Sequence, residues 1–206
     1  AHDVFHAGLL ATAQPGEQPA DTFTDDPLEL TPANELLKDQ GNDPLVHSAE
    51  PFKSDRLVYV SDRLPKAITL AGAMQLLANI SLDTPDGDVG AEVDAILPDG
   101  RTLVLGQDFM RARFRHGVTH AESVKPGAID PWHFDGFYFT VRELPAGTRL
   151  RVVLAPLNMP DLQKNYNSGG RLGYETAKDA RTATFEVHLD PQHPSYLEMP
   201  LAPDSH

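Results

Sequence analysis

Apolar and polar residues alternate most clearly between residues 148 and 155. Leu150, Val152 and Leu154 occupy every second position there. A period of two predicts a β-strand with one face in a hydrophobic core. A turn with proline and glycine precedes this segment, and Pro156 follows it, where proline cannot donate a hydrogen bond to a neighbouring strand. We therefore expect a central strand and, after it, a structured loop over residues 156–170.

Similar segments recur from residue 56 onward, separated by turns rich in proline, glycine and aspartate. They predict about nine strands and no long helix. The expected strands span residues 56–60, 66–70, 74–82, 89–97, 101–115, 132–144, 148–155, 181–189 and 196–199. Gly106 interrupts the segment 101–115, and we expect a β-bulge there. The pattern favours an all-β fold, a β-sandwich with the turn spacing of a jelly roll.

The first 55 residues have a different texture. Residues 11–55 are acidic and interrupted by many prolines, and we expect them to form a long strap on another surface. Thr31 as an N-cap, with Pro32 after it, predicts one short helical turn. The chain opens inside an expected strand around Val4 and Phe5, which indicates the tail end of a preceding region. The expected division is 1–55 for this tail and the strap, and 56–206 for the sandwich domain.

Length, charge and cysteine content narrow the classes of function. A chain of 206 residues can bury roughly two-thirds of its unfolded surface. Its net charge of −13 repels phosphate backbones and anionic lipids, so we expect no nucleic-acid or membrane partner. No apolar run approaches the roughly 20 residues that span a bilayer. The absence of cysteine excludes disulfides and thiolate chemistry, but it leaves the compartment open between the cytoplasm and the periplasm or secretion.

Histidine pairs are the first candidates for metal or catalytic chemistry. His116 and His120 are four residues apart, but the glycine and turn residues around them make a metal-binding helix a poor interpretation. His188 and His193 fit the end of a strand and a turn. The sequence contains no Gly-x-Ser-x-Gly elbow, phosphate-binding glycine loop or His-Glu-x-x-His motif. We therefore assign no catalytic, cofactor-binding or metal-binding residue and expect no cofactor.

Two further patterns leave alternatives open. Asp83, Asp86 and Asp88 lie in one turn and could offer oxygen ligands to calcium, although aspartate is also an ordinary turn residue. This would suit a structural or adhesion module. A run of aromatic residues could instead line a sugar-binding face and make the chain a carbohydrate-binding module, although such runs more often form a core. The aromatic candidates are Trp132, Phe134, Phe137, Tyr138, Phe139 and, in the later loop, Tyr166.

Seven segments in consistent order, together with the strap, resemble a known family over nearly the whole chain. They are Leu57–Ser61 with Leu70–Gly72, the turn Asp83–Asp88, Asp94–Gly100, Met110–Arg115, Leu144–Leu150, Asn165–Gly169 and His193–Pro200, and the strap sequence is Asp21–Pro27. The chain resembles the C-terminal jelly-roll domain of X-prolyl dipeptidyl-peptidases and cocaine esterase-like (CocE/NonD) serine hydrolases. That group also includes α-amino-acid ester hydrolases and glutaryl-cephalosporin acylases.

The resemblance implies a galactose-binding-domain-like sandwich that packs on an α/β-hydrolase domain of the same polypeptide. In such enzymes the Ser-Asp-His triad lies in that other domain and acts on acyl bonds of esters and amides. Neither His2 nor His6 has the family's Gly-Pro-Trp-x-His-like context. We therefore expect a noncatalytic domain that shapes the entrance of the active site. The strap 11–55 and the loop 156–170 are the expected docking surfaces, and a homo-oligomer is a further possibility.

Overall fold

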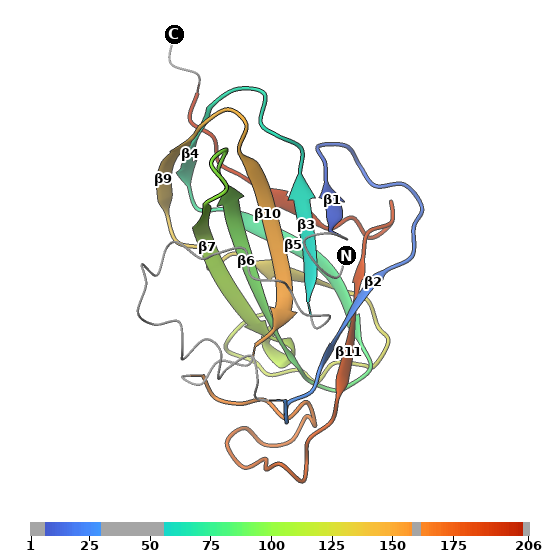
Figure 1. Cartoon of the computed structure of the whole chain (residues 1–206). Coiled ribbons are helices and arrows are strands. Elements are labelled where there is room, and N and C mark those ends of the chain that lie inside the picture. The colour runs from blue at the N-terminus through green and yellow to red at the C-terminus, as the bar shows by residue number, and fades with distance from the viewer. Residues whose placement is uncertain (1–6, 30–55, 158–161, 204–206) are drawn as a thin grey trace.

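A computed structural model describes residues 7–29, 56–157 and 162–203 of the chain. Two β-sheets pack face to face around one core, and a two-stranded sheet lies at their side (Figure 1). The only helical turn among the described residues is the 3-10 turn η1 (Ala112–Phe114). The strands are β1 (Gly8–Leu10), β2 (Asp21–Asp25), β3 (Leu57–Ser61), β4 (Ile68–Gly72), β5 (Gln75–Leu82), β6 (Asp88–Ile96), β7 (Thr102–Arg111), β8 (Asp130–Phe134), β9 (Thr140–Leu144), β10 (Arg149–Pro156), β11 (Ala183–His188) and β12 (Tyr196–Glu198).

The first sheet has the order β1-β3-β10-β6-β7, and the second has the order β12-β5-β11-β2, with β8 also paired to β5. β1 runs parallel to β3, whereas the other pairs are antiparallel. β10 lies at the centre of the first sheet, between β3 and β6. The predicted all-β sandwich and its central strand are confirmed.

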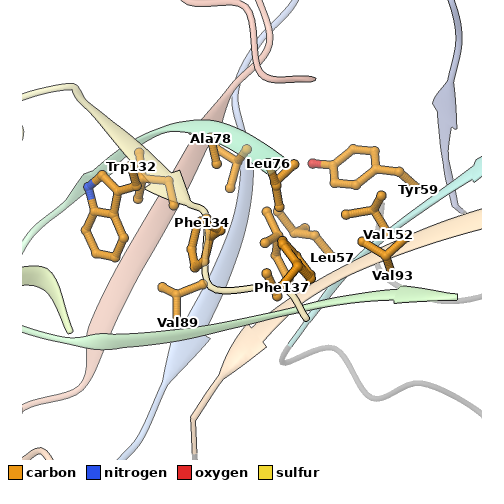
Figure 2. Close-up of a cluster of buried hydrophobic side chains, with 14 of the residues drawn as sticks. Leu57, Tyr59, Leu76, Ala78, Val89, Val93, Trp132, Phe134, Phe137 and Val152 are labelled. Atoms are coloured by element: carbon orange, nitrogen blue, oxygen red, sulfur yellow. The ribbon is translucent and has the colours of Figure 1, made fainter. Parts of the chain in front are cut away.

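The core contains the side chains that the period-two pattern places on the inner faces (Figure 2). Leu150, Val152 and Leu154 of β10 are buried there. From the second sheet come Trp132 and Phe134, both fully buried. Large apolar side chains of both sheets therefore meet in the middle of the sandwich, which is the arrangement that stabilises packed sheets.

The bulge expected at Gly106 is confirmed. Val93 of β6 pairs with Gly106, but the next residue, Asp94, pairs with Val104, so one residue of β7 has no opposite partner. The glycine also leaves room for a core side chain, since a Cβ at this position would lie 2.9 Å from the Phe137 ring. A larger residue at position 106 would therefore displace Phe137.

The single strand predicted over 132–144 is wrong. It is two strands in different sheets, because β8 pairs with β5 and β9 pairs with β4. The break lies between Phe134 and Thr140, where the Gly136 N–H donates to Asp108 Oδ2 at 2.8 Å. Phe137 turns into the core against Gly106, and this contact leads the chain out of the second sheet.

The strap also contains structure that the sequence analysis did not predict. β2 lies within residues 11–55 and pairs with β11, so this part belongs to the second sheet. Its Phe23 is 2% exposed and stacks on Phe185 with ring centroids 4.9 Å apart. β1, within the expected tail, adds an edge strand to the first sheet. The helical turn expected at Thr31 and the strand expected around Val4 lie outside the described residues.

Candidate functional site

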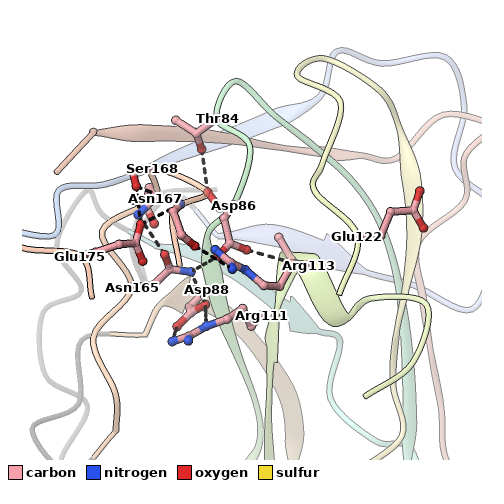
Figure 3. A network of polar contacts seen from close by, with 12 residues as sticks. Thr84, Asp86, Asp88, Arg111, Arg113, Glu122, Asn165, Asn167, Ser168 and Glu175 are labelled. Carbon is pink, nitrogen blue, oxygen red and sulfur yellow. Dashed lines mark hydrogen bonds and ion pairs between the residues drawn. The ribbon is translucent and has the colours of Figure 1, made fainter. Parts of the chain in front are cut away.

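A buried polar network lies where the turn 83–88 meets the loop 162–170, at one end of the sandwich (Figure 3). Asp86 is fully buried and accepts hydrogen bonds from the backbone N–H of Arg113 at 3.1 Å and from its Nε at 2.7 Å. Asp88 forms a two-point ion pair with the Arg111 guanidinium, with both N–O distances at 2.8 Å. Two guanidinium groups from the end of β7 and η1 thus hold two carboxylates of the turn.

Two asparagines fasten the loop to this network. The Asn165 amide donates to Asp86 Oδ2 at 3.0 Å and to Asp88 Oδ1 at 2.7 Å. The Asn167 amide donates to Asp25 Oδ2 at 2.9 Å, and its backbone has a φ of 59°, a left-handed conformation that asparagine tolerates well. The loop expected after the central strand is therefore tied to β2 and to the 83–88 turn.

These contacts bear on the calcium alternative. Asp86 and Asp88 direct their carboxylates at arginine and asparagine, and Asp83 accepts the backbone N–H of Thr184 at 2.8 Å. Burial raises the pKa of Asp88, while hydrogen bonds from Arg111 and Asn165 lower it. Within residues 7–29, 56–157 and 162–203, no group of three or more histidine, cysteine or acidic side chains is placed to hold a metal ion. The geometry does not favour a calcium loop.

The histidine candidates have separate local partners. His116 Nδ1 lies 3.2 Å from Glu122 Oε2, and His193 Nδ1 lies 3.2 Å from Asp190 Oδ1. The rings of His188 and His193 are 5.8 Å apart and tilted. His2 and His6 lie outside the described residues.

Ser81 and His188 form a contact that resembles a nucleophile–base pair. The Ser81 Oγ lies 2.9 Å from His188 Nε2 and donates to Glu186 Oε2 at 2.9 Å. A catalytic serine gives its proton to the histidine and faces a substrate. Ser81 gives its proton to a carboxylate and is 1% exposed, so a substrate carbonyl cannot reach it. This pair does not form a triad.

The aromatic run does not form a sugar-binding platform. Trp132, Phe134 and Phe137 are buried in the core, whereas Tyr138 is 50% exposed and Phe139 is 71% exposed. The two exposed rings line a shallow groove of about 240 Å³ between β7 and the start of β9. A sugar stacks on an accessible ring face, and the largest ring of the run is therefore not available to it.

Asp94 provides a pH-dependent contribution to stability. Its carboxylate is buried and lies 2.8 Å from Arg151 Nε. Burial and the nearby Glu92 raise the pKa of Asp94 to about 7, although Arg151 lowers it. The folded chain therefore keeps a proton that the unfolded chain releases near pH 4. Stability from this group is complete below pH 4 and is lost as the pH rises to 7, by up to about 1.4 kcal/mol per pH unit.

We expect the melting temperature to fall as the pH is raised from 5 to 7. In the Asp94→Asn variant we expect the melting temperature to depend less on pH over this range. Asp99→Asn is the control, because the Arg101 backbone N–H lowers the pKa of exposed Asp99 and moves its titration below this range. Thermal unfolding followed by circular dichroism measures the effect. An unchanged slope in Asp94→Asn would contradict it.

The strands and their shared core define an all-β sandwich domain. A family model described as the X-Pro dipeptidyl-peptidase C-terminal non-catalytic domain matches residues 6–198. The chain belongs to this family. It is 28% identical over 197 residues to cocaine esterase from Rhodococcus sp. (strain MB1 Bresler), covering 94% of this chain and 34% of that protein.

Solved structures agree on the fold. An aminopeptidase from a marine sediment Thaumarchaeota archaeon superposes with a TM-score of 0.84 at 19% identity, covering 96% of this chain and 36% of that one. An α-amino acid ester hydrolase gives a TM-score of 0.80 at 19% identity, covering 96% of this chain and 35% of that one. The chain thus spans about a third of the length of these proteins. No helix in the described part is long and apolar enough to cross a bilayer.

Proposed function

We propose that this chain is the C-terminal domain of a serine hydrolase that cleaves acyl esters or amides, and that it packs on an α/β-hydrolase domain of the same polypeptide. The observation that carries the proposal is the match of the noncatalytic family over residues 6–198, in a chain that spans about a third of its relatives. The relative most similar in sequence among these is a cocaine esterase, which supports ester hydrolysis in the longer protein.

The role of the sandwich in this proposal is architectural. It shapes the entrance to an active site whose serine, histidine and acid lie in the other domain. The docking surfaces that we propose remain the strap 11–55 and the loop 156–170. The fixed shape of the loop supports its role as a docking surface, because Asn165 and Asn167 join it to the body of the sandwich. Residues 30–55 and 158–161 lie outside the described residues.

Hydrolysis tests this proposal. A p-nitrophenyl acyl ester and an Ala-Pro-type amide are offered to the 206-residue chain and to the full-length gene product. We expect turnover of at least one substrate by the longer protein and none by the chain alone, because Ser81 is buried and bonded to a carboxylate. Turnover by the short chain that a serine-directed inhibitor abolishes would overturn the noncatalytic assignment.

A further inference from the structure

The segment after the polar network, residues 171–181, projects from the same end of the sandwich (Figure 1). It contains neither strand nor helix, yet its start is fixed by hydrogen bonds. The Glu175 carboxylate accepts the Gly170 N–H at 3.1 Å and also contacts the Ser168 hydroxyl. Arg113 adds a bond from its guanidinium to the Gly170 carbonyl at 3.0 Å.

Two exposed side chains stand on this fixed base. The Arg171 guanidinium carbon lies 4.1 Å from the centre of the Tyr174 ring, which is cation–π geometry. Tyr174 is 69% exposed. The turn beneath them is closed by a bond from the Tyr174 N–H to the Arg171 carbonyl at 3.0 Å. The planar cation and the ring therefore lie against each other, and both are open to a partner.

The polar network contributes less to the free energy of unfolding than its many contacts suggest, which favours a role in positioning the loop. Buried ion pairs add little net stability compared with apolar residues of the same size, because both charges lose their hydration. Asp86 of the 83–88 turn and Asn167 of the loop are nevertheless fully buried. Its hydrogen bonds hold the loop at Gly170, just before the Arg171–Tyr174 pair. A surface that is fixed before binding loses less entropy when it binds. Tyrosine and arginine are also the residues that most often dominate binding energy in interfaces.

Charge points to the kind of partner. Residues 162–181 contain four basic residues, Lys164, Arg171, Lys178 and Arg181, and two acidic residues, Glu175 and Asp179, whereas the whole chain has a net charge of −13. This basic segment on an acidic domain complements a surface that offers carboxylates. An Arg–Tyr pair fits a carboxylate next to an apolar side chain, since the guanidinium binds carboxylates in a two-point manner.

We infer that the Arg171–Tyr174 pair is an anchor that docks on a carboxylate-bearing surface of the α/β-hydrolase domain in the same polypeptide. The inference rests on the proposed function and extends the docking surface beyond residue 170. Two observations favour the α/β-hydrolase domain as the partner of the anchor. The relatives are about three times as long as this chain, and the anchor belongs to a basic segment of an otherwise acidic domain.

Thiol labelling of the full-length protein tests the anchor. These 206 residues contain no cysteine, so a cysteine introduced here is the only one in this domain, and its labelled peptide is told by mass from any peptide of the rest of the protein. One variant carries Ala177→Cys, beside the anchor, and another carries Val118→Cys, at a position that is 86% exposed in a different loop. Each native protein is treated with a maleimide, and the labelled peptide is identified by mass. We expect position 177 to react at least about ten-fold more slowly than position 118, because docking hides it.

Charge reversal shows whether Arg171 is responsible. We expect Arg171→Glu to bring the labelling rate at position 177 close to that at position 118. Lys125→Glu, the same charge change at an exposed site in another loop, should leave it slow. Arg171→Ala serves if the reversal prevents folding. Equal rates at 118 and 177 before any charge change, or a slow rate that survives Arg171→Ala, would overturn the inference.

Two other outcomes remain distinguishable. Protection at position 177 that disappears when dilution separates a dimer, as followed by sedimentation, would assign the anchor to a second copy and overturn the inference. Labelling does not require turnover, so a longer protein that shows protection without hydrolysis would refute the proposed activity and leave the docking intact.

Discussion

Replacing Arg113 with methionine is expected to destabilise the chain by about 3–5 kcal/mol, because it leaves the buried Asp86 carboxylate without its cation. Asp86 is fully buried, and both the Nε and the terminal nitrogen of Arg113 lie 2.7 Å from its Oδ2. The Asn165 amide alone cannot replace that interaction. Urea unfolding followed by circular dichroism measures the change in free energy.

The control is Arg101→Met. Arg101 pairs with Asp99 at 2.8 Å, but both side chains are more than half exposed, so we expect a change below about 1 kcal/mol. The double variant Arg113→Met with Asp86→Leu should recover much of the lost stability, since no unpaired charge then remains in the interior. A loss from Arg113→Met that matches the Arg101→Met value would show that the network is not coupled to folding.

Trp132→Ala is expected to cost about 3–5 kcal/mol, the usual loss for a large aromatic side chain removed from a core. Trp132 is fully buried, and it meets the Phe185 ring edge to face at 6.4 Å between centroids. Urea unfolding again measures the loss.

Tyr138→Ala is the matched aromatic control, because Tyr138 is 50% exposed beside the groove. We expect it to change the free energy of unfolding by about 1 kcal/mol or less. If Trp132→Ala were as mild as the control while titration with a glycan panel gave saturable binding, the carbohydrate-binding alternative would gain support.

Strand positions could be predicted where apolar residues occupy every second position of a strand. Leu150, Val152 and Leu154 do so, and their strand lies where it was expected, although Arg151 and Val153 on its other face are buried as well. The rule fails at Phe137, where apolar residues continue past a strand end because the chain turns into the core at Gly106. Local alternation does not reveal that change of sheet, since it depends on a contact between residues about thirty positions apart.

β2 was missed for a related reason. Its five residues lie in an acidic segment with many prolines, and only the pairing with β11 makes them a strand. The resemblance to the family, in contrast, depended on ordered short motifs and indicated the correct family without knowledge of these pairings.

The polar network could be predicted only in part. The mixture of small, polar and aromatic residues around Asn165 indicated a structured loop, and Asp86 and Asp88 drew attention as possible calcium ligands. Their real partners come from distant positions, such as Asn165, which lies 79 residues from Asp86 and 77 from Asp88. One signal was available in the sequence. Arg111, Arg113 and Arg115 alternate at the end of a strand beside an acidic turn, a spacing that would place basic side chains together.

The position of β2 also determines when the sandwich can close during synthesis. Residues 21–25 join the second sheet by pairing with residues 183–187, so this strand has no described strand partner until most of the domain has left the ribosome. During that time Phe23 lacks Phe185, the ring on which it stacks in the folded domain. Pairing across so long a stretch of chain folds slowly, and the waiting apolar strand is exposed to aggregation. The apolar side chain of β2 therefore stays without its stacking partner until β11 emerges.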